Sequence, residues 1–136
     1  MAKIALISCV KRKLNHRAKA EDIYNSPLFK MSMNYARSLN PDEIYILSAK
    51  YGLLDLEKKI EPYNLTLNKM PKKKREEWAE KVVRQLEDVT DIQKDEFIFL
   101  ASQRYREYII HSVKNYSVPM AGLSIGLQLG FLKRNS

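Results

Sequence analysis

Cysteine and histidine are scarce in this sequence, and their scarcity excludes several kinds of site. Cys9 is the single cysteine, so the chain can form neither an intramolecular disulfide nor a cysteine-based metal cluster. The two histidines, His16 and His111, lie far apart and lack the spacing of a metal-binding pair. We therefore expect no bound metal and no cofactor.

Several sequence signatures are missing as well. The chain has no Walker phosphate loop, no G-x-G-x-x-G fingerprint and no G-x-S-x-G nucleophile elbow. Its N-terminal apolar run, within MAKIALISCV, is too short to span a membrane and lacks the small-residue cleavage site of a signal peptide. We expect a cytoplasmic protein that does not contact a membrane.

The chain is short and strongly basic. Its 136 residues contain no repeat and no low-complexity segment, so we expect a single α/β domain over residues 1–136. Its 24 basic and 16 acidic residues give a net charge of +8. Because lysine and arginine displace counterions from phosphates, this excess favours nucleic acid or a phosphate-bearing small molecule as the partner. The oligomeric state stays open.

Hydrophobic patterning predicts the order of the elements. The apolar run at residues 3–9 is typical of a strand covered on both faces, and Ser26-Pro27 has the residues of a helix start. A strand at 43–47 then completes a βαβ unit, which implies parallel strands. The later predicted elements are a helix at 71–88, a strand at 96–101, a helix after Ser102 and a short strand at 116–120. Together they predict a three-layer α/β/α sandwich with a mostly parallel four-stranded sheet.

Two segments are harder to interpret. Residues 53–69 contain Pro62 and predict a long irregular loop, a kind of segment that is often functional. In the tail, alternating apolar residues are typical of a strand, whereas glycines at every fourth position suit a helix. We favour a loop followed by a helix from about Ile125.

The end of the first strand is a candidate site, because ligands of open α/β sheets bind outside the carboxyl ends of the strands. Ser8 and Cys9 end this strand, and a basic loop follows. Nearby cations favour a thiolate, so Cys9 is a candidate nucleophile, although a small buried side chain is the plainer alternative. We expect Lys11 and Lys13 to clamp a phosphate, with Arg12 facing the other way; a solvated basic loop is the alternative.

The end of the second strand is the more specific signal. Ser48 is followed by Lys50, Tyr51 and Gly52 on a tight strand exit where glycine can adopt a positive φ. Lys50 is a candidate acid, base or phosphate ligand, and Tyr51 is a candidate stacking surface for a base. A plain turn with an exposed lysine and a packed tyrosine remains the alternative.

The long loop and the next helix add further candidates. Glu61 and Tyr63 flank Pro62, and Glu61 is a candidate general base if the loop folds over the site. The charge run at 72–75 lies at a helix start, where cations oppose the helix dipole and an arriving anion would relieve that repulsion. A solvated helix end explains the same run.

These motifs resemble an uncharacterised bacterial and phage domain family whose members are often labelled YaaA-like peroxide stress proteins. The matching segments are Ser8-Cys9-x-Lys11-x-Lys13, Ile23-Tyr24-x-Ser26-x-Leu28-Phe29, Leu47-Ser48-Ala49-Lys50-Tyr51-Gly52-Leu53 and Ile60-Glu61-Pro62-Tyr63-x-x-Thr66-Leu67. The first segment is also similar, more distantly, to a domain of archaeosine synthase. That resemblance implies a uracil-DNA glycosylase-like fold, with a parallel sheet in the order 2-1-3-4, and a role in nucleic-acid or modified-base metabolism. The glycosylase motifs Gly-Gln-Asp-Pro and His-Pro-Ser are absent, so it does not imply uracil excision.

Three functions fit these observations. The first is an enzyme of nucleic-acid or nucleotide metabolism, with Cys9, Lys50 and Glu61 as catalytic residues. In it, Ser8, Lys11, Lys13, Ser48, Tyr51, Gly52 and Tyr63 bind the ligand. The second is a non-catalytic nucleic-acid-binding protein of stress or phage biology, and the third is a protein-interaction domain with a vestigial pocket.

Overall fold

Strand β1 (Lys3–Ser8) is the central strand of the sheet. It pairs in parallel with β3 (Glu43–Ser48) on one side and with β6 (Glu96–Leu100) on the other. Beyond β6 lies β7 (Asn115–Ser117), also parallel, and beyond β3 lies β4 (Gly52–Asp55), which is antiparallel. The sheet is therefore mixed and five-stranded, in the order β4-β3-β1-β6-β7.

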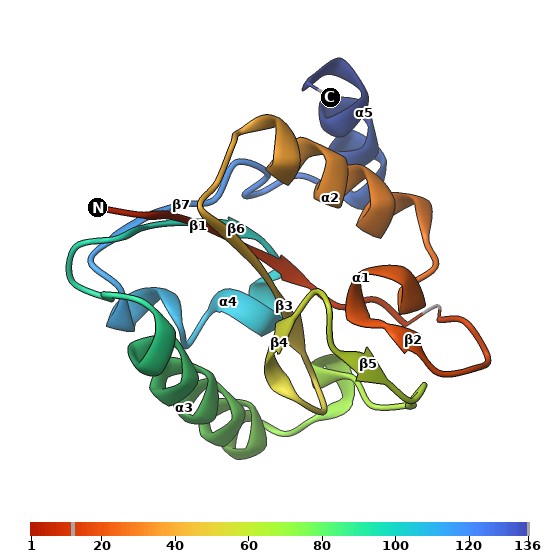
Figure 1. Ribbon diagram of the computed structural model, residues 1–136, viewed down its shortest axis with the longest axis horizontal. Helices are drawn as coiled ribbons and strands as arrows, with labels where there is room; N and C mark the ends of the chain where they lie inside the picture. The colour runs from red at the N-terminus through yellow and green to blue at the C-terminus, as the bar shows by residue number, and fades with distance from the viewer. Residues whose placement is uncertain (12, 136) are drawn as a thin grey trace.

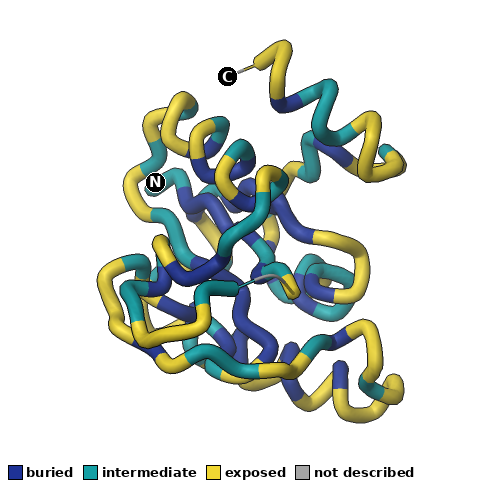
Figure 2. The backbone as a smooth tube through the Cα atoms, turned by 90° about the vertical axis from the view of Figure 1, so that its right-hand side faces the viewer, coloured by how far each residue is buried: buried dark blue, intermediate teal, exposed yellow. Residues whose placement is uncertain are grey.

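Helices lie on both faces of this sheet. Figure 1 shows α2 (Pro27–Ser38) and α5 (Ile125–Asn135) on one face, and α3 (Lys72–Val89) and α4 (Gln103–Arg106) on the other. The four residues from Ile4 to Ile7 are consequently buried, as a strand between two helical layers requires. Figure 2 shows the same enclosure, with the buried strands inside and the exposed segments at the periphery.

Shorter elements surround one end of the sheet. Strands β2 (Ala18–Lys19) and β5 (Lys59–Ile60) form a separate antiparallel pair, and α1 (Ala20–Ile23) follows β2 directly. The 3₁₀ turn η1 (Leu67–Lys69) completes the set, whereas a second one, η2 (Ile110–Ser112), precedes β7 at the end where the parallel strands start. In Figure 1, β2, β5 and α1 lie beyond the carboxyl end of β1.

The coordinates are a computed structural model that describes residues 1–11 and 13–135. The predicted orientation of Arg12 lies outside the described residues. No described helix combines the length and the apolar character needed to cross a lipid bilayer.

The predicted α/β class is confirmed, but the prediction of four strands is wrong. Gly52 adopts a φ of 75°, which lets the chain reverse immediately after β3. Leu53 and Leu54 then pair back along β3, and Leu54 is buried. Residues 53–69 therefore include most of β4, all of β5 and η1, and the expected irregular loop is confined largely to residues 61–66 around Pro62.

Two later predictions need a smaller correction. The helix expected after Ser102 is broken into α4 and η2, with i→i+3 hydrogen bonds from Ile109 N to Arg106 O and from Ser112 N to Ile109 O, both 2.9 Å. The β-branched pair Ile109-Ile110 has low helix propensity, which favours this break. In the tail, the favoured helix from Ile125 is the structure observed.

Asp95 ties the start of β6 to the start of β1. One carboxylate oxygen accepts a hydrogen bond from Ala2 N and the other from Asp91 N, each at 2.8 Å. These two backbone donors, Asp91 first, lower the pKa of Asp95. The carboxylate therefore contributes stability that is present above the unfolded pKa, near pH 3.9, and lost as the pH falls through the lowered folded pKa.

We expect Asp95→Asn to lower the urea midpoint at neutral pH, because the amide presents one oxygen and one opposing donor to two N–H groups. The difference from the parent protein should shrink as the pH falls below about 4, because the carboxylate is then protonated in the unfolded chain and, at lower pH, in the folded chain as well. Urea denaturation across this pH range measures both effects. Glu87→Gln, at an exposed position of α3, is the matched control and should change neither quantity.

Candidate functional site

The carboxyl ends of the four parallel strands lie at one edge of the sheet. Helices α4 and α5 come next after β6 and β7, and α2 comes after β1, β2 and α1; all three have residues of their first turns or caps at the end of β1. Exposed N–H groups at helix starts give such an edge a positive potential. The edge is therefore suited to an anionic ligand before any side chain is considered.

A pocket of about 500 Å³ lies at this edge, at the ends of β1 and β6. One part of its wall is apolar and is formed by Val10, Leu28, Leu65, Met70 and Ile125. The other part is polar and is formed by Ser8, Cys9, Lys11, Lys13, Asn64, Thr66, Asn68, Lys69, Ser102 and Tyr105. A smaller cavity of about 60 Å³ adjoins it and shares Ser8, Val10, Leu28 and Ser102.

Cys9 and Tyr105 form the most buried polar pair of this wall. Cys9 is 7% exposed and Tyr105 is 4% exposed. Cys9 Sγ donates to the Tyr105 hydroxyl at 3.3 Å, and Leu67 N donates to the same oxygen at 3.4 Å. Burial, and secondarily the charge of an ionised Cys9, raise the pKa of Tyr105. Tyr105 therefore keeps its proton at neutral pH and can donate to a thiolate or a ligand.

Lys13 closes the loop that follows β1. Its Nζ donates to Val10 O at 2.9 Å and to Lys11 O at 3.2 Å. The ammonium also lies 4.4 Å from the ring centre of Tyr63 and 5.6 Å from that of Tyr24, within cation–π range. Burial lowers the pKa of Lys13, and a negative charge on Cys9 opposes this. Lys13 therefore holds the loop from inside, whereas Lys11 is exposed.

A chain of hydroxyl groups lies beneath Lys13. Tyr63 OH lies 2.7 Å from Tyr24 OH and 2.8 Å from Ser48 Oγ. Ser48 Oγ also accepts from Lys50 N at 3.3 Å and from Tyr51 N at 3.1 Å, so its own proton is available to Tyr63. Burial is the main cause of the raised pKa of both tyrosines, which therefore stay neutral donors and acceptors.

The turn after β3 is held from α3. Trp78 Nε1 donates to Ser48 O at 2.9 Å, and its ring packs edge-on against Tyr105 with centres 5.6 Å apart. Gln85 Oε1 accepts from Leu53 N at 2.8 Å and occupies the space that a Cβ on Gly52 would need. The positive φ of Gly52 favours glycine, and a side chain there would also displace Gln85 Oε1 from its hydrogen bond with Leu53 N.

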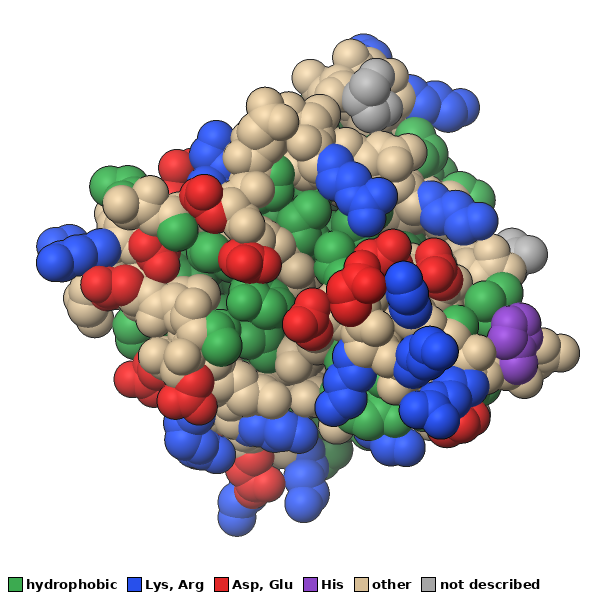
Figure 3. All heavy atoms as spheres, in the orientation of Figure 1, with side chains coloured by type: hydrophobic (Ala, Val, Ile, Leu, Met, Phe, Trp, Pro, Cys, Tyr) green, Lys and Arg blue, Asp and Glu red, His purple; other side chains and the backbone are tan. Residues whose placement is uncertain are grey.

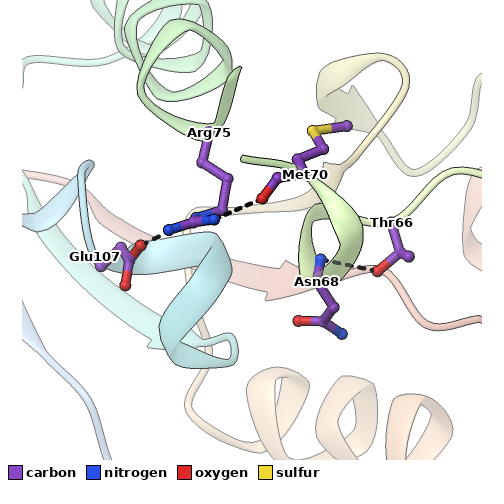
Figure 4. Close-up of polar contacts among 5 residues, drawn as sticks. All are labelled: Thr66, Asn68, Met70, Arg75 and Glu107. Atoms are coloured by element: carbon purple, nitrogen blue, oxygen red, sulfur yellow. Dashed lines mark hydrogen bonds and ion pairs between the residues drawn. The ribbon is translucent and has the colours of Figure 1, made fainter. Parts of the chain in front are cut away.

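The pocket wall at residues 64–70 is fixed by a largely buried ion pair (Figure 4). Arg75, at the start of α3, donates from Nη1 to Met70 O at 2.6 Å and from Nε to Glu107 Oε1 at 3.3 Å. Thr66 Oγ1 accepts from Asn68 N at 3.2 Å and caps η1. The guanidinium therefore joins this wall to the segment that follows α4.

The predicted site residues separate into three groups. Ser8, Cys9, Lys11 and Lys13 line the pocket. Ser48 and Tyr63 lie next to it in the hydroxyl chain, and Lys13 links the two groups through its contact with Tyr63.

The third group lies away from the pocket wall and consists of Lys50, Tyr51, Gly52 and Glu61. Lys50 is exposed, with its Nζ 5.4 Å from the Tyr51 ring centre, and Tyr51 packs edge-on against Tyr63. Glu61 is exposed after β5. The four residues of the basic run at 72–75 differ in exposure: Arg75 is buried in its ion pair, whereas the three lysines are exposed.

Sequence reasoning did not single out Tyr105, Thr66 and Lys69 as site residues. Tyr105 lies within the helix predicted after Ser102, where nothing local marks it as a site residue. Thr66 and Lys69 belong to a segment expected to be irregular. Among the described residues, no three His, Cys, Asp or Glu side chains are grouped as a metal site requires.

We expect Ser48→Ala to lower the free energy of unfolding by about 1–3 kcal/mol. The substitution removes the acceptor of the Lys50 and Tyr51 N–H groups and the hydrogen-bond partner of the Tyr63 hydroxyl. Urea denaturation measures the change. Ser38→Ala is the control, since Ser38 is exposed at the end of α2 and should change stability by less than about 0.5 kcal/mol. Equal effects of the two substitutions would contradict a structural role for the hydroxyl chain.

Comparison with known proteins gives one positive result. No curated protein and no solved structure matches the chain. The resemblance to YaaA-like proteins and to archaeosine synthase accordingly stays a prediction. A family match, in contrast, extends over residues 4–134. The chain belongs to the family of unknown function DUF6884.

Proposed function

We propose that this protein is an enzyme of nucleic-acid or nucleotide metabolism that acts on a base or nucleotide held in the pocket beside Cys9. The observation that carries the proposal is the composition of this pocket. An apolar wall, a buried thiol–phenol pair and exposed lysines meet at the carboxyl edge of a parallel sheet. A nucleotide combines a flat, largely apolar base with a charged phosphate and fits both halves.

Size and charge support a ligand of this class. A volume of about 500 Å³ is in the range of small-molecule and cofactor sites. Lys11 and Lys69 are exposed at the wall and can meet a phosphate without first breaking an ion pair with any described residue. Leu28 in the first turn of α2 and Ile125 at the start of α5 bring two helix N-termini to the pocket, which adds to the attraction of an anion.

Cys9 is the proposed reactive group. It is the pocket's only thiol, it ends β1, and Tyr105 is placed to donate a hydrogen bond to the thiolate once Cys9 has lost its proton. Lys50 and Glu61 remain proposed catalytic residues, and both would have to act from outside the pocket wall. The order β3-β1-β6-β7 also agrees with the 2-1-3-4 order expected for a uracil-DNA glycosylase-like domain, which supports a role in modified-base metabolism.

A second candidate function is nucleic-acid binding without catalysis. Lys72, Lys73 and Lys74 are exposed at the start of α3, next to the pocket wall, and favour contact with a phosphate backbone. The two functions differ in whether Cys9 is needed for a chemical change.

We expect nucleoside monophosphates to bind the parent protein and Lys11→Gln/Lys69→Gln to weaken that binding by at least about tenfold, because two charge-assisted contacts are lost. Isothermal titration calorimetry at low salt measures it. Lys94→Gln/Lys114→Gln is the matched control, since it removes two exposed lysines just before β6 and β7, at the opposite edge of the sheet. The proposal fails if no nucleotide binds or if both variants bind like the parent.

Catalysis is tested separately with Cys9→Ser. Nucleotides and short oligonucleotides are incubated with the protein and examined by mass spectrometry for a change in the base. We expect a mass change with the parent protein and none with Cys9→Ser, while nucleotide binding is retained. Binding without any mass change in either protein would favour the non-catalytic function.

A further inference from the structure

We infer that the nucleotide reaches the pocket as part of a single polynucleotide strand, whose backbone passes over the lysines at the start of α3. This inference rests on the proposed function and names the form of its substrate. Three lysines, Lys69, Lys72 and Lys73, carry it and are called the lysine strip below. All three are exposed.

The lysine strip begins at the pocket itself. Lys69 and Met70 belong to the pocket wall, and only Met70 and Pro71 separate Lys69 from Lys72. Both intervening residues have extended backbone, with ψ of 143° and 160°. Three residues of extended chain span at most about 11 Å.

The neighbouring arginine is turned inward and fixes the strip in place. Arg75 is 9% exposed, and its guanidinium is bound to Met70 O and Glu107. The same side chain therefore anchors the end of the pocket wall and the first turn of α3 (Figure 4). A backbone lying on Lys72 and Lys73 would keep a constant position relative to the pocket opening.

The charges of the strip are available. Lys74 is partly neutralised by Glu77 at 3.9 Å, whereas Lys72 and Lys73 form no ion pair with any described residue. Pro71, the N-cap residue, makes no side-chain cap, so the first N–H groups of α3 add to the positive potential. In Figure 3, basic side chains gather at the lower edge of the molecule, over the first turns of α3. A free mononucleotide would use the lysine at the pocket and would leave Lys72 and Lys73 without a ligand.

The test compares a single-stranded oligonucleotide of about eight residues with the corresponding nucleoside monophosphates. We expect the oligonucleotide to bind more tightly than any monophosphate. Lys72→Gln/Lys73→Gln should remove most of this advantage and reduce the slope of log K against log salt by about 1.4, since each single-strand phosphate contact contributes about 0.7. Binding of the monophosphates should change little.

The control is again Lys94→Gln/Lys114→Gln, which removes the same charge from the opposite edge. Circular dichroism checks that every variant is folded. Equal affinities for oligonucleotide and monophosphate, or an equal loss of the oligonucleotide advantage in both double variants, overturn the inference and leave the proposed function standing. Failure of the parent protein to bind any nucleotide overturns both.

Discussion

The parallel pairing of β1 with β3 and β6 is the constraint on which the rest of the structure depends. The hydrogen bonds of this pairing satisfy the backbone N–H and C=O groups of the buried central strands. Because the strands run in the same direction, they all end at one edge of the sheet. A protein of this architecture needs no dedicated scaffold for a site at that edge. The thiol of Cys9, the loop after it and the first turns of the helices are brought there by strand direction alone.

The side chains of the site are held by contacts from residues that do not line the pocket. Trp78 connects the end of β3 to Tyr105, and Arg75 connects the wall at 64–70 to the segment after α4. Both residues belong to α3, so one helix positions two sides of the pocket. This arrangement explains why α3 carries a buried arginine at a position where a solvated charge would be ordinary. Its ion pair with Glu107 satisfies the charge that burial would otherwise penalise.

Much of the fold could be predicted from local patterns, and the site only in part. The apolar run of β1 predicts a buried strand, and Ser26-Pro27 predicts the start of α2. Both predictions succeed because the signals lie in residues that are adjacent in the sequence. Likewise, Cys9 and Lys11 could be placed at the pocket because they follow a strand directly. Strand β4 was missed because it depends on the chain reversal at Gly52 and on pairing with β3, neither of which has a periodic signal. Tyr105 and the inward turn of Arg75 were missed because each is defined by a partner distant in the sequence.

The contact between Cys9 and Tyr105 has a consequence for the order of folding. The two residues are separated by 96 positions, whereas Tyr24, Ser48 and Tyr63 meet across separations of 39 and 15. Closing a long loop requires more chain entropy to be lost before the contact is gained. The hydroxyl chain can therefore assemble with the first half of the chain, and the thiol acquires its phenol only when β6 has joined β1. Until then the thiol of Cys9 is without that partner, even where β1, β3 and the hydroxyl chain are already in place.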